Sequence, residues 1–245
     1  MRRINIKKIL NKIRNVFHFK KSFAEFNRLA KEHGFPLAKW SEIYPILGEN
    51  TKETSFDSHY IYHPAWAMQV IKIINPIKHT DISSILSFSA NLSAFVPTEF
   101  YDYRPANLKL KNLKVGHADL TSLPFPDNSI ESLSCMHTIE HVGLGRYGDE
   151  IDPNGDKKAA LELKRVLKKD GNLIVVVPVG NPTIKFNAHR IYSFEQVLEM
   201  FSGLTLIDHM LVPDNAIENG IIERPKESLI NSQIYGCGCF WFKNK

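Results

Sequence analysis

Three residues that can move protons or bind a metal ion lie close together in the middle of the chain: His137, Glu140 and His141. An imidazole titrates near neutral pH, so His137 or His141 can act as a general base toward a substrate hydroxyl. Imidazole nitrogens and a carboxylate can also hold a divalent ion that acts as a Lewis acid. The residues alone leave two alternatives open: a metal site, or histidines held by hydrogen bonds, one of which acts as a metal-free general base.

A glycine-rich loop follows these residues and contains Arg146, Tyr147 and Asp149. The planar guanidinium group of an arginine can bind a phosphate or a carboxylate through two parallel hydrogen bonds. Because loops often carry binding residues, we predict that these three side chains contact a phosphate or a sugar of the substrate. The alternative is an ordinary turn held by an Arg–Asp pair.

The elements that must position these residues alternate between short apolar segments and helical segments. This alternation is typical of a parallel sheet with helices on both faces. The predicted strands are 80–88, 98–103, 113–117, 130–136, 173–178, 204–212 and 234–242, and the clearest helix between them is 159–167. We therefore predict a doubly wound α/β fold with a mostly parallel sheet of the seven-stranded type over residues 76–245.

Residues 1–75 are predicted to form an N-terminal helical extension. Apolar residues recur at three- and four-residue steps from Ile6 to Phe17 among lysines and arginines, which predicts a basic amphipathic helix. Further helices are expected at 23–33 and 64–74, with a loop-rich connection over 35–62.

The basic charge of the chain is local. Eight Lys and Arg residues precede the first acid, Glu25; the whole chain carries +5, so the remainder carries −3. A mildly acidic domain argues against a nucleic-acid partner. The segment 1–21 has two interpretations: a reversible contact with anionic lipid or an acidic partner, or a helix that packs on the domain.

The cysteine and hydropathy patterns bear on the compartment. Three cysteines are too few and too unevenly placed for a disulfide framework, and no apolar run approaches the roughly 20 residues of a membrane-spanning helix. We expect a cytoplasmic protein, peripheral at the inner membrane face if residues 1–21 contact lipid.

The stretches ADLTSLPFPDNSIESLSCMHTIEHV and ALELKRVLKKDGNLIVVVP resemble the middle of class I S-adenosylmethionine-dependent methyltransferases. The resemblance implies that Asp119 accepts a hydrogen bond from the adenine amino group, with the Leu120 backbone beside it. It implies that Asp102 binds the ribose hydroxyls, in keeping with ligand binding at the carboxyl ends of strands. His137 would also contact the cofactor.

One stretch departs from that family. Methyltransferases usually carry a glycine-rich turn after the first strand, where this chain has Asp81, Ile82, Ser83 and Ser84. Asp81 and Ser83 are still expected to contact S-adenosylmethionine. Because serine resists a positive φ, the alternative is a methyltransferase fold that has lost its cofactor.

A narrower resemblance rests on HYIYHPAW, HTDISS, YDYRP, SCMHTIEHVGLGRYGDEIDP and FNAHRIYS. These motifs look like a family of methyltransferase-like proteins associated with bacterial surface-polysaccharide synthesis. The resemblance implies a small-molecule or glycan acceptor, such as a nucleotide sugar. Asn187 and Arg190 are expected to bind it.

The run H-x-x-E-H also occurs in inverzincin peptidases, but the glycines that follow it break the long helix such a site needs. Metal-dependent O-methyltransferases of ubiquinone biosynthesis and of small RNA carry E-x-x-E-H at this strand end, and His189 looks like the later histidine of the small-RNA enzymes. The resemblance implies that His137, Glu140, His141 and His189 bind Mg, Mn, Fe or Zn. The isolated histidines His59, His63 and His117 are interpreted as structural or substrate-facing.

The predicted function is transfer of a methyl group from S-adenosylmethionine to a sugar hydroxyl, with a metal ion or a histidine base activating the oxygen. The alternative is a catalytically silent binding or scaffold protein in a polysaccharide assembly.

Overall fold

The computed structural model describes residues 6–245. The chain divides into two compact units, of which the first ends at Phe56 and the second begins at Asp57. Residues 1–5, which include Arg2 and Arg3 of the expected lipid-contacting segment, lie outside the described residues. The helix expected at 64–74 belongs to the second unit, whereas the sequence grouped it with the N-terminal extension.

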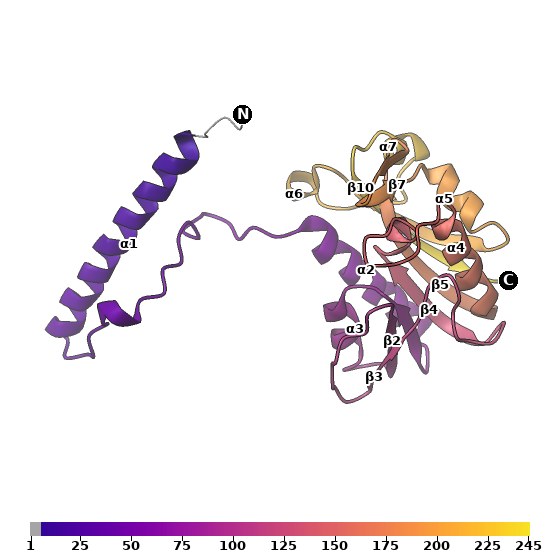
Figure 1. Ribbon diagram of the computed structural model, residues 1–245, viewed down its shortest axis with the longest axis horizontal. Coiled ribbons are helices and arrows are strands. Elements are labelled where there is room, and N and C mark those ends of the chain that lie inside the picture. Colours follow the sequence, from indigo (N-terminus) through magenta and orange to yellow (C-terminus); the bar gives the residue numbers. More distant parts are fainter. Residues whose placement is uncertain (1–5) are drawn as a thin grey trace. The chain divides into compact units, whose positions relative to one another are not determined.

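The first unit is one long helix followed by a returning chain (Figure 1). Helix α1 (Ile6–Glu32) is continuous where two helices were expected, since no glycine or proline interrupts it. The short 3-10 helix η1 (Trp40–Glu42) returns to it, and the Trp40 ring lies 5.0 Å from the Phe23 ring. The predicted N-terminal helix is therefore confirmed.

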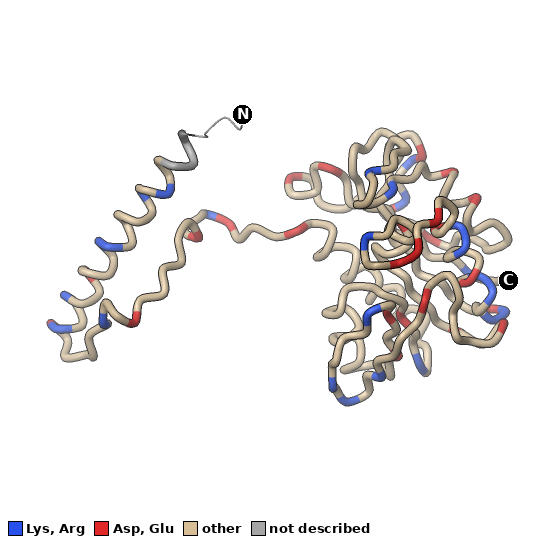
Figure 2. Tube along the Cα trace, viewed as in Figure 1, with Lys and Arg blue, Asp and Glu red and all other residues tan. Residues whose placement is uncertain are grey.

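Lys and Arg residues recur along α1 (Figure 2). Apolar side chains on the same helix are also exposed: Leu10 by 59%, Ile13 by 62% and Phe17 by 72%. Within residues 6–245, no helix is both long and apolar enough to cross a bilayer.

The second unit contains, within the described residues, an eight-stranded sheet in the order β3-β2-β1-β4-β5-β10-β8-β9. Its strands are β1 (His79–Ile82), β2 (Thr98–Asp102), β3 (Leu113–His117), β4 (Ile130–Met136), β5 (Leu167–Val179), β8 (Thr205–Val212), β9 (Ile222–Glu223) and β10 (Gly236–Lys243). The pairs among β1 to β5 are parallel, and β10 runs antiparallel between β5 and β8. A separate hairpin consists of β6 (Thr183–Lys185) and β7 (His189–Ile191).

Helices cover both faces of the sheet. Buried residues of α2 (Ser58–Ile74), α3 (Leu86–Leu92) and α6 (Ala216–Asn219) form one apolar cluster with the sheet, while α4 (Gly155–Val166), α5 (Phe194–Met200) and α7 (Glu227–Asn231) contribute to a second. Both layers of helices are needed because strands of this sheet are apolar on both sides: the segment Val175–Val177 of β5, for example, is buried at every residue. The predicted doubly wound α/β fold is confirmed.

Two elements begin or end away from their predicted positions. The first strand ends at Ile82 rather than near residue 88, because Ser83 turns the backbone with φ +57° before α3 begins. Helix α2 begins at Ser58, inside the segment expected to be a loop, because the Asp57 side chain caps it by accepting a hydrogen bond from the Tyr60 backbone N–H. The earlier start places His59 and His63 on a helix.

The order in which the chain adds strands to the sheet reverses between β1 and β4. The first three strands lie in order on one side of this point and β4 and β5 lie on the other. The carboxyl ends of parallel strands at such a switch point form the usual ligand crevice of open α/β sheets.

Candidate functional site

Two adjoining cavities lie at the carboxyl ends of the parallel strands. The smaller, of about 170 Å³, is lined by Ser83, Asp102, Tyr103, Arg104, Ala118, Asp119, Leu120, His137, Thr138, His141, Val142, Tyr147 and Asp149. The larger, of about 680 Å³, is lined by Tyr60, Ser83, Ser84, Ile85, Met136, His137, Glu140, His141, Arg146, Tyr147, Asn187, Ala188, His189 and Tyr235. Ser83, His137, His141 and Tyr147 line both, so the two cavities share a wall.

Two acids at the ends of the neighbouring strands β2 and β3 line the smaller cavity: Asp102 is the last residue of β2, and Asp119 comes shortly after β3. One oxygen of Asp102 accepts a hydrogen bond from the Arg104 backbone N–H at 2.7 Å. One oxygen of Asp119 accepts from both the backbone N–H and the hydroxyl of Thr121. Among the described residues, the second oxygen of each acid accepts no hydrogen bond. Each carboxylate is thus held in place with one oxygen left for a ligand.

The turn after β1, where this chain lacks the glycines of the methyltransferase pattern, is formed by Ser83. Ser83 adopts φ +57°, the left-handed conformation that a glycine would normally supply at this point. Its backbone N–H donates to the Tyr101 carbonyl, and its own carbonyl accepts from the Thr138 hydroxyl at 2.8 Å. These two contacts hold a strained residue at the wall of both cavities.

Asp81 does not line either cavity, in contrast to its expected role as a cofactor ligand. It is fully buried, and its oxygens accept hydrogen bonds of 2.5 Å from the hydroxyls of Ser84, Ser89 and Ser134. The pKa of Asp81 is raised to about 6, because burial outweighs these three hydrogen bonds. Its position supports the turn below the cavities rather than a ligand contact.

His137 and Glu140 form a buried pair at the end of β4. The Nδ1 atom of His137 donates to Oε1 of Glu140 at 3.0 Å, and the two side chains are 4% and 1% exposed. Burial lowers the pKa of His137, but the Cys237 sulfur and the Glu140 carboxylate beside it raise that pKa above its ordinary value. His137 is therefore a poor proton acceptor.

His141 has the opposite properties. Its Nδ1 atom donates to the Ala188 carbonyl at 2.6 Å, which leaves the lone pair on Nε2. Burial lowers the pKa of His141 below 6.5, so the ring is neutral at neutral pH. His141 lines both cavities and is the better placed general base.

The four predicted metal ligands all line the larger cavity. Their contacts are not those of one metal centre, since Glu140 already holds His137 at 3.0 Å and lies 3.7 Å from Nε2 of His141. In the described part of the chain, the donors that gather within 4.8 Å of one another belong instead to His59, His137 and Cys237. His189 faces Tyr235, and its buried Nε2 has no hydrogen-bond partner among the described residues. The metal role of the predicted set stays a prediction.

The glycine-rich loop is organised by Asp149. Its carboxylate accepts hydrogen bonds from the backbone N–H groups of Gly143, Gly145 and Tyr147, and these bonds lower its pKa against the effect of burial. Asp149 therefore shapes the loop more than it offers free oxygens to a substrate. The Tyr147 ring lies beneath the guanidinium groups of Arg104 and Arg146, at 4.4 and 5.1 Å from its centre.

The two remaining expected substrate ligands differ in exposure. Asn187 is exposed and lines the larger cavity. Arg190 lines neither cavity: it is 5% exposed, donates to the carbonyl of Val142 at 2.7 Å and lies 3.5 Å from Asp156. Its guanidinium group ties the loop after η2 (Ile139–His141) to α4, and it is not available to a substrate.

Residues that the sequence did not single out also line the site. Arg104 lies in the smaller cavity, and Tyr60 and Tyr235 lie in the larger one. Arg104 could have been found, because it follows Asp102 at a strand end. Tyr60 could have been predicted if Asp57 had been taken as a helix cap, because the helix would then begin just before Tyr60. Tyr235 could not, since it precedes the last strand and only the order of strands in the sheet brings it to the larger cavity.

Comparisons with known families match part of the chain. Residues 125–218 match the family described as "Caenorhabditis protein of unknown function, DUF268". An uncharacterised protein of Methanocaldococcus jannaschii is 36% identical over 87 residues, which cover 34% of this chain and 33% of that protein. The match thus spans about a third of the relative's length.

Solved structures of methyltransferases share the fold. A protein from Bacillus halodurans described as a methyltransferase has a TM-score of 0.53 at 16% identity, covering 74% of this chain and 98% of its own. The 1,6-didemethyltoxoflavin-N1-methyltransferase of Burkholderia thailandensis, solved with S-adenosylhomocysteine, gives 0.52 at 14% identity over 74% and 76%. A Thermotoga maritima methyltransferase dependent on S-adenosylmethionine gives 0.51 at 16% over 75% and 90%. This chain has the fold of class I methyltransferases.

Proposed function

We propose that this chain is an S-adenosylmethionine-dependent methyltransferase that binds its cofactor in the smaller cavity. The observation that supports this most strongly is an arrangement of four residues at the carboxyl ends of four adjacent parallel strands, where they line one cavity at the switch point: Ser83, Asp102, Asp119 and His137. The left-handed Ser83 supplies the turn that glycine provides in other methyltransferases.

The side chains of the smaller cavity suit the parts of the cofactor. Asp119 and the Leu120 backbone would bind adenine, and Asp102 would accept hydrogen bonds from the ribose hydroxyls. Both acids keep an oxygen free for this purpose among the described residues. Bound S-adenosylmethionine would supply an electrophilic methyl group.

The larger cavity suits an acceptor with a sugar ring. Tyr60, Tyr147 and Tyr235 offer aromatic faces, while Arg146 and Asn187 offer hydrogen-bond donors. We therefore propose O-methylation of a sugar hydroxyl in a nucleotide sugar or surface glycan. His141 lines both cavities, so a hydroxyl in the larger one can give its proton to Nε2 of His141 while its oxygen takes the methyl group.

Calorimetric titration with S-adenosylmethionine and S-adenosylhomocysteine tests the cofactor site. Asp119→Ala and Asp102→Ala each remove a hydrogen bond to a charged group, of about 1.5–3 kcal/mol, so each should weaken binding about 10- to 150-fold. Glu131→Ala is a matched control, because Glu131 is exposed near the amino end of β4 and lines neither cavity.

Two results would contradict the proposal. Unchanged affinity in Asp102→Ala and Asp119→Ala would place the cofactor elsewhere. A wild-type chain that binds neither compound would favour the silent scaffold protein instead.

A further inference from the structure

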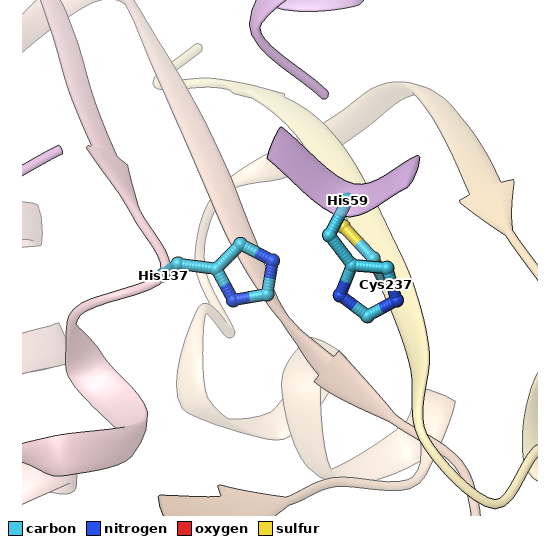
Figure 3. A group of neighbouring side chains, drawn as sticks. All are labelled: His59, His137 and Cys237. Carbon is cyan, nitrogen blue, oxygen red and sulfur yellow. The ribbon is translucent and has the colours of Figure 1, made fainter. Parts of the chain in front are cut away.

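A second group of chemically active side chains lies beside the candidate catalytic residues. His59 comes from the first turn of α2, His137 from the end of β4 and Cys237 from the start of β10 (Figure 3). Each offers one donor atom, and the three donor atoms lie within 4.8 Å of one another. Two imidazoles and a thiol from three separate elements thus converge on one point.

The Nε2 atom of His137 is placed to bind a metal ion at this point. Its Nδ1–H is already taken by Glu140, while its Nε2 atom is buried and has no hydrogen-bond partner among the described residues. A buried polar nitrogen left unpaired is costly, and proteins rarely tolerate one without a ligand or water. A histidine that donates one N–H to a carboxylate and binds the metal through its other nitrogen is the usual form of a metal-binding histidine.

The other two donors are held in place as well. The His59 ring lies nearly parallel to the rings of His137 and Tyr235, with centres 5.4 and 5.2 Å away. The next turn of α2 adds His63, whose Nδ1 donates to the His59 carbonyl at 2.6 Å. Cys237 is fully buried.

We propose that His59, His137 and Cys237 bind a divalent ion of the zinc type. A thiolate with imidazole nitrogens suits Zn²⁺ and not Mg²⁺, which requires oxygen ligands. Binding would displace the thiol proton of Cys237 and the Nε2 proton of His137, and it would close the three donors around the ion. Three protein ligands leave one tetrahedral position for water or another donor. This site goes beyond the methyl transfer proposed above and does not depend on cofactor binding.

The test uses the full chain stripped with a chelator and then titrated with Zn²⁺ and with Co²⁺. We expect one ion per chain and, with Co²⁺, a thiolate-to-metal charge-transfer band in the near ultraviolet. Cys237→Ala should abolish the band, and His59→Ala should weaken zinc binding at least about tenfold. Cys135→Ala is the matched control, because Cys135 is equally buried on β4 and packs in the other apolar cluster.

Glu140→Gln tests the site without removing a ligand. The loss of a carboxylate behind a metal-binding histidine should weaken zinc affinity about 10- to 100-fold and leave the cobalt band present at saturation. Should Cys237→Ala fail to fold, the half-buried His59 still provides a ligand variant, checked by thermal unfolding with and without Zn²⁺. A wild-type chain that binds no zinc, or a cobalt band that survives in Cys237→Ala or disappears in Cys135→Ala, would overturn the proposal.

Discussion

Replacing Asp81 by asparagine should change how the stability of the domain depends on pH. The carboxyl group is fully buried, and its pKa is raised from 3.8 to about 6. The protonated form is therefore favoured in the folded state, so the contribution of Asp81 is most favourable below about pH 4 and is lost as pH rises through 6. Above pH 6 the ionised group costs about 3 kcal/mol relative to the unfolded chain.

Asparagine has nearly the same shape and no charge to bury. Its oxygen can accept from Ser84 and Ser134 as one Asp81 oxygen does, and its amide can donate to the Ser89 hydroxyl. Urea unfolding of both proteins between pH 4 and 8 gives the free energy of unfolding of each. The titration of all other groups contributes equally to both proteins, so it cancels in the difference between the two free energies. We expect Asp81→Asn to gain stability relative to wild type as pH rises from 4 to 7, by up to about 3 kcal/mol. A difference that does not change with pH, or that changes with the opposite sign, would refute this account of the buried acid.

Three further predictions concern the site, its support and the N-terminal helix. His141→Ala should lower kcat about 10²- to 10⁴-fold with unchanged affinity for S-adenosylmethionine, and a variant with the full rate would exclude His141 as the base. Because burial lowers the pKa of His141, wild-type activity should fall only as pH drops below 6.5. Arg190→Ala removes the only cation beside the buried Asp156 carboxylate among the described residues, which then keeps the Tyr192 hydroxyl as its donor, so urea unfolding should show a loss of about 3–5 kcal/mol. A loss below about 1 kcal/mol would contradict the buried contacts of Arg190. Deleting residues 1–21 should abolish sedimentation with phosphatidylserine vesicles and leave cofactor affinity intact, whereas vesicle binding that survives the deletion would exclude the lipid interpretation.

The sheet could be predicted because its strands are apolar on both sides and separated by helical segments. Val175–Val177, for example, is buried at every residue, which a parallel strand between two helical layers requires. The turn after the first strand could not be predicted in detail. Serine rarely adopts a positive φ, and only the contacts of Ser83 with β2 and with Thr138 show how this turn is held.

The candidate site was only partly predictable. Local spacing was enough to bring His137, Glu140 and His141 together, since they follow one strand directly. His59 was interpreted as structural or substrate-facing because it is isolated in the sequence. The cap at Asp57, which begins α2 just before it, is a weak local pattern. The meeting of His59 with Cys237 depends on the antiparallel insertion of β10 beside β5, which no local pattern indicates.

The ribose and adenine contacts are the central claim, and an experimental structure with S-adenosylhomocysteine at saturating concentration tests them most directly. We predict the ligand in the smaller cavity, with the ribose hydroxyls within about 3 Å of the Asp102 carboxylate and the adenine amino group within about 3 Å of Asp119. We further predict that its sulfur points toward the wall shared with the larger cavity, near His141. A ligand bound away from Asp102 and Asp119, or a smaller cavity that stays empty, would contradict the account.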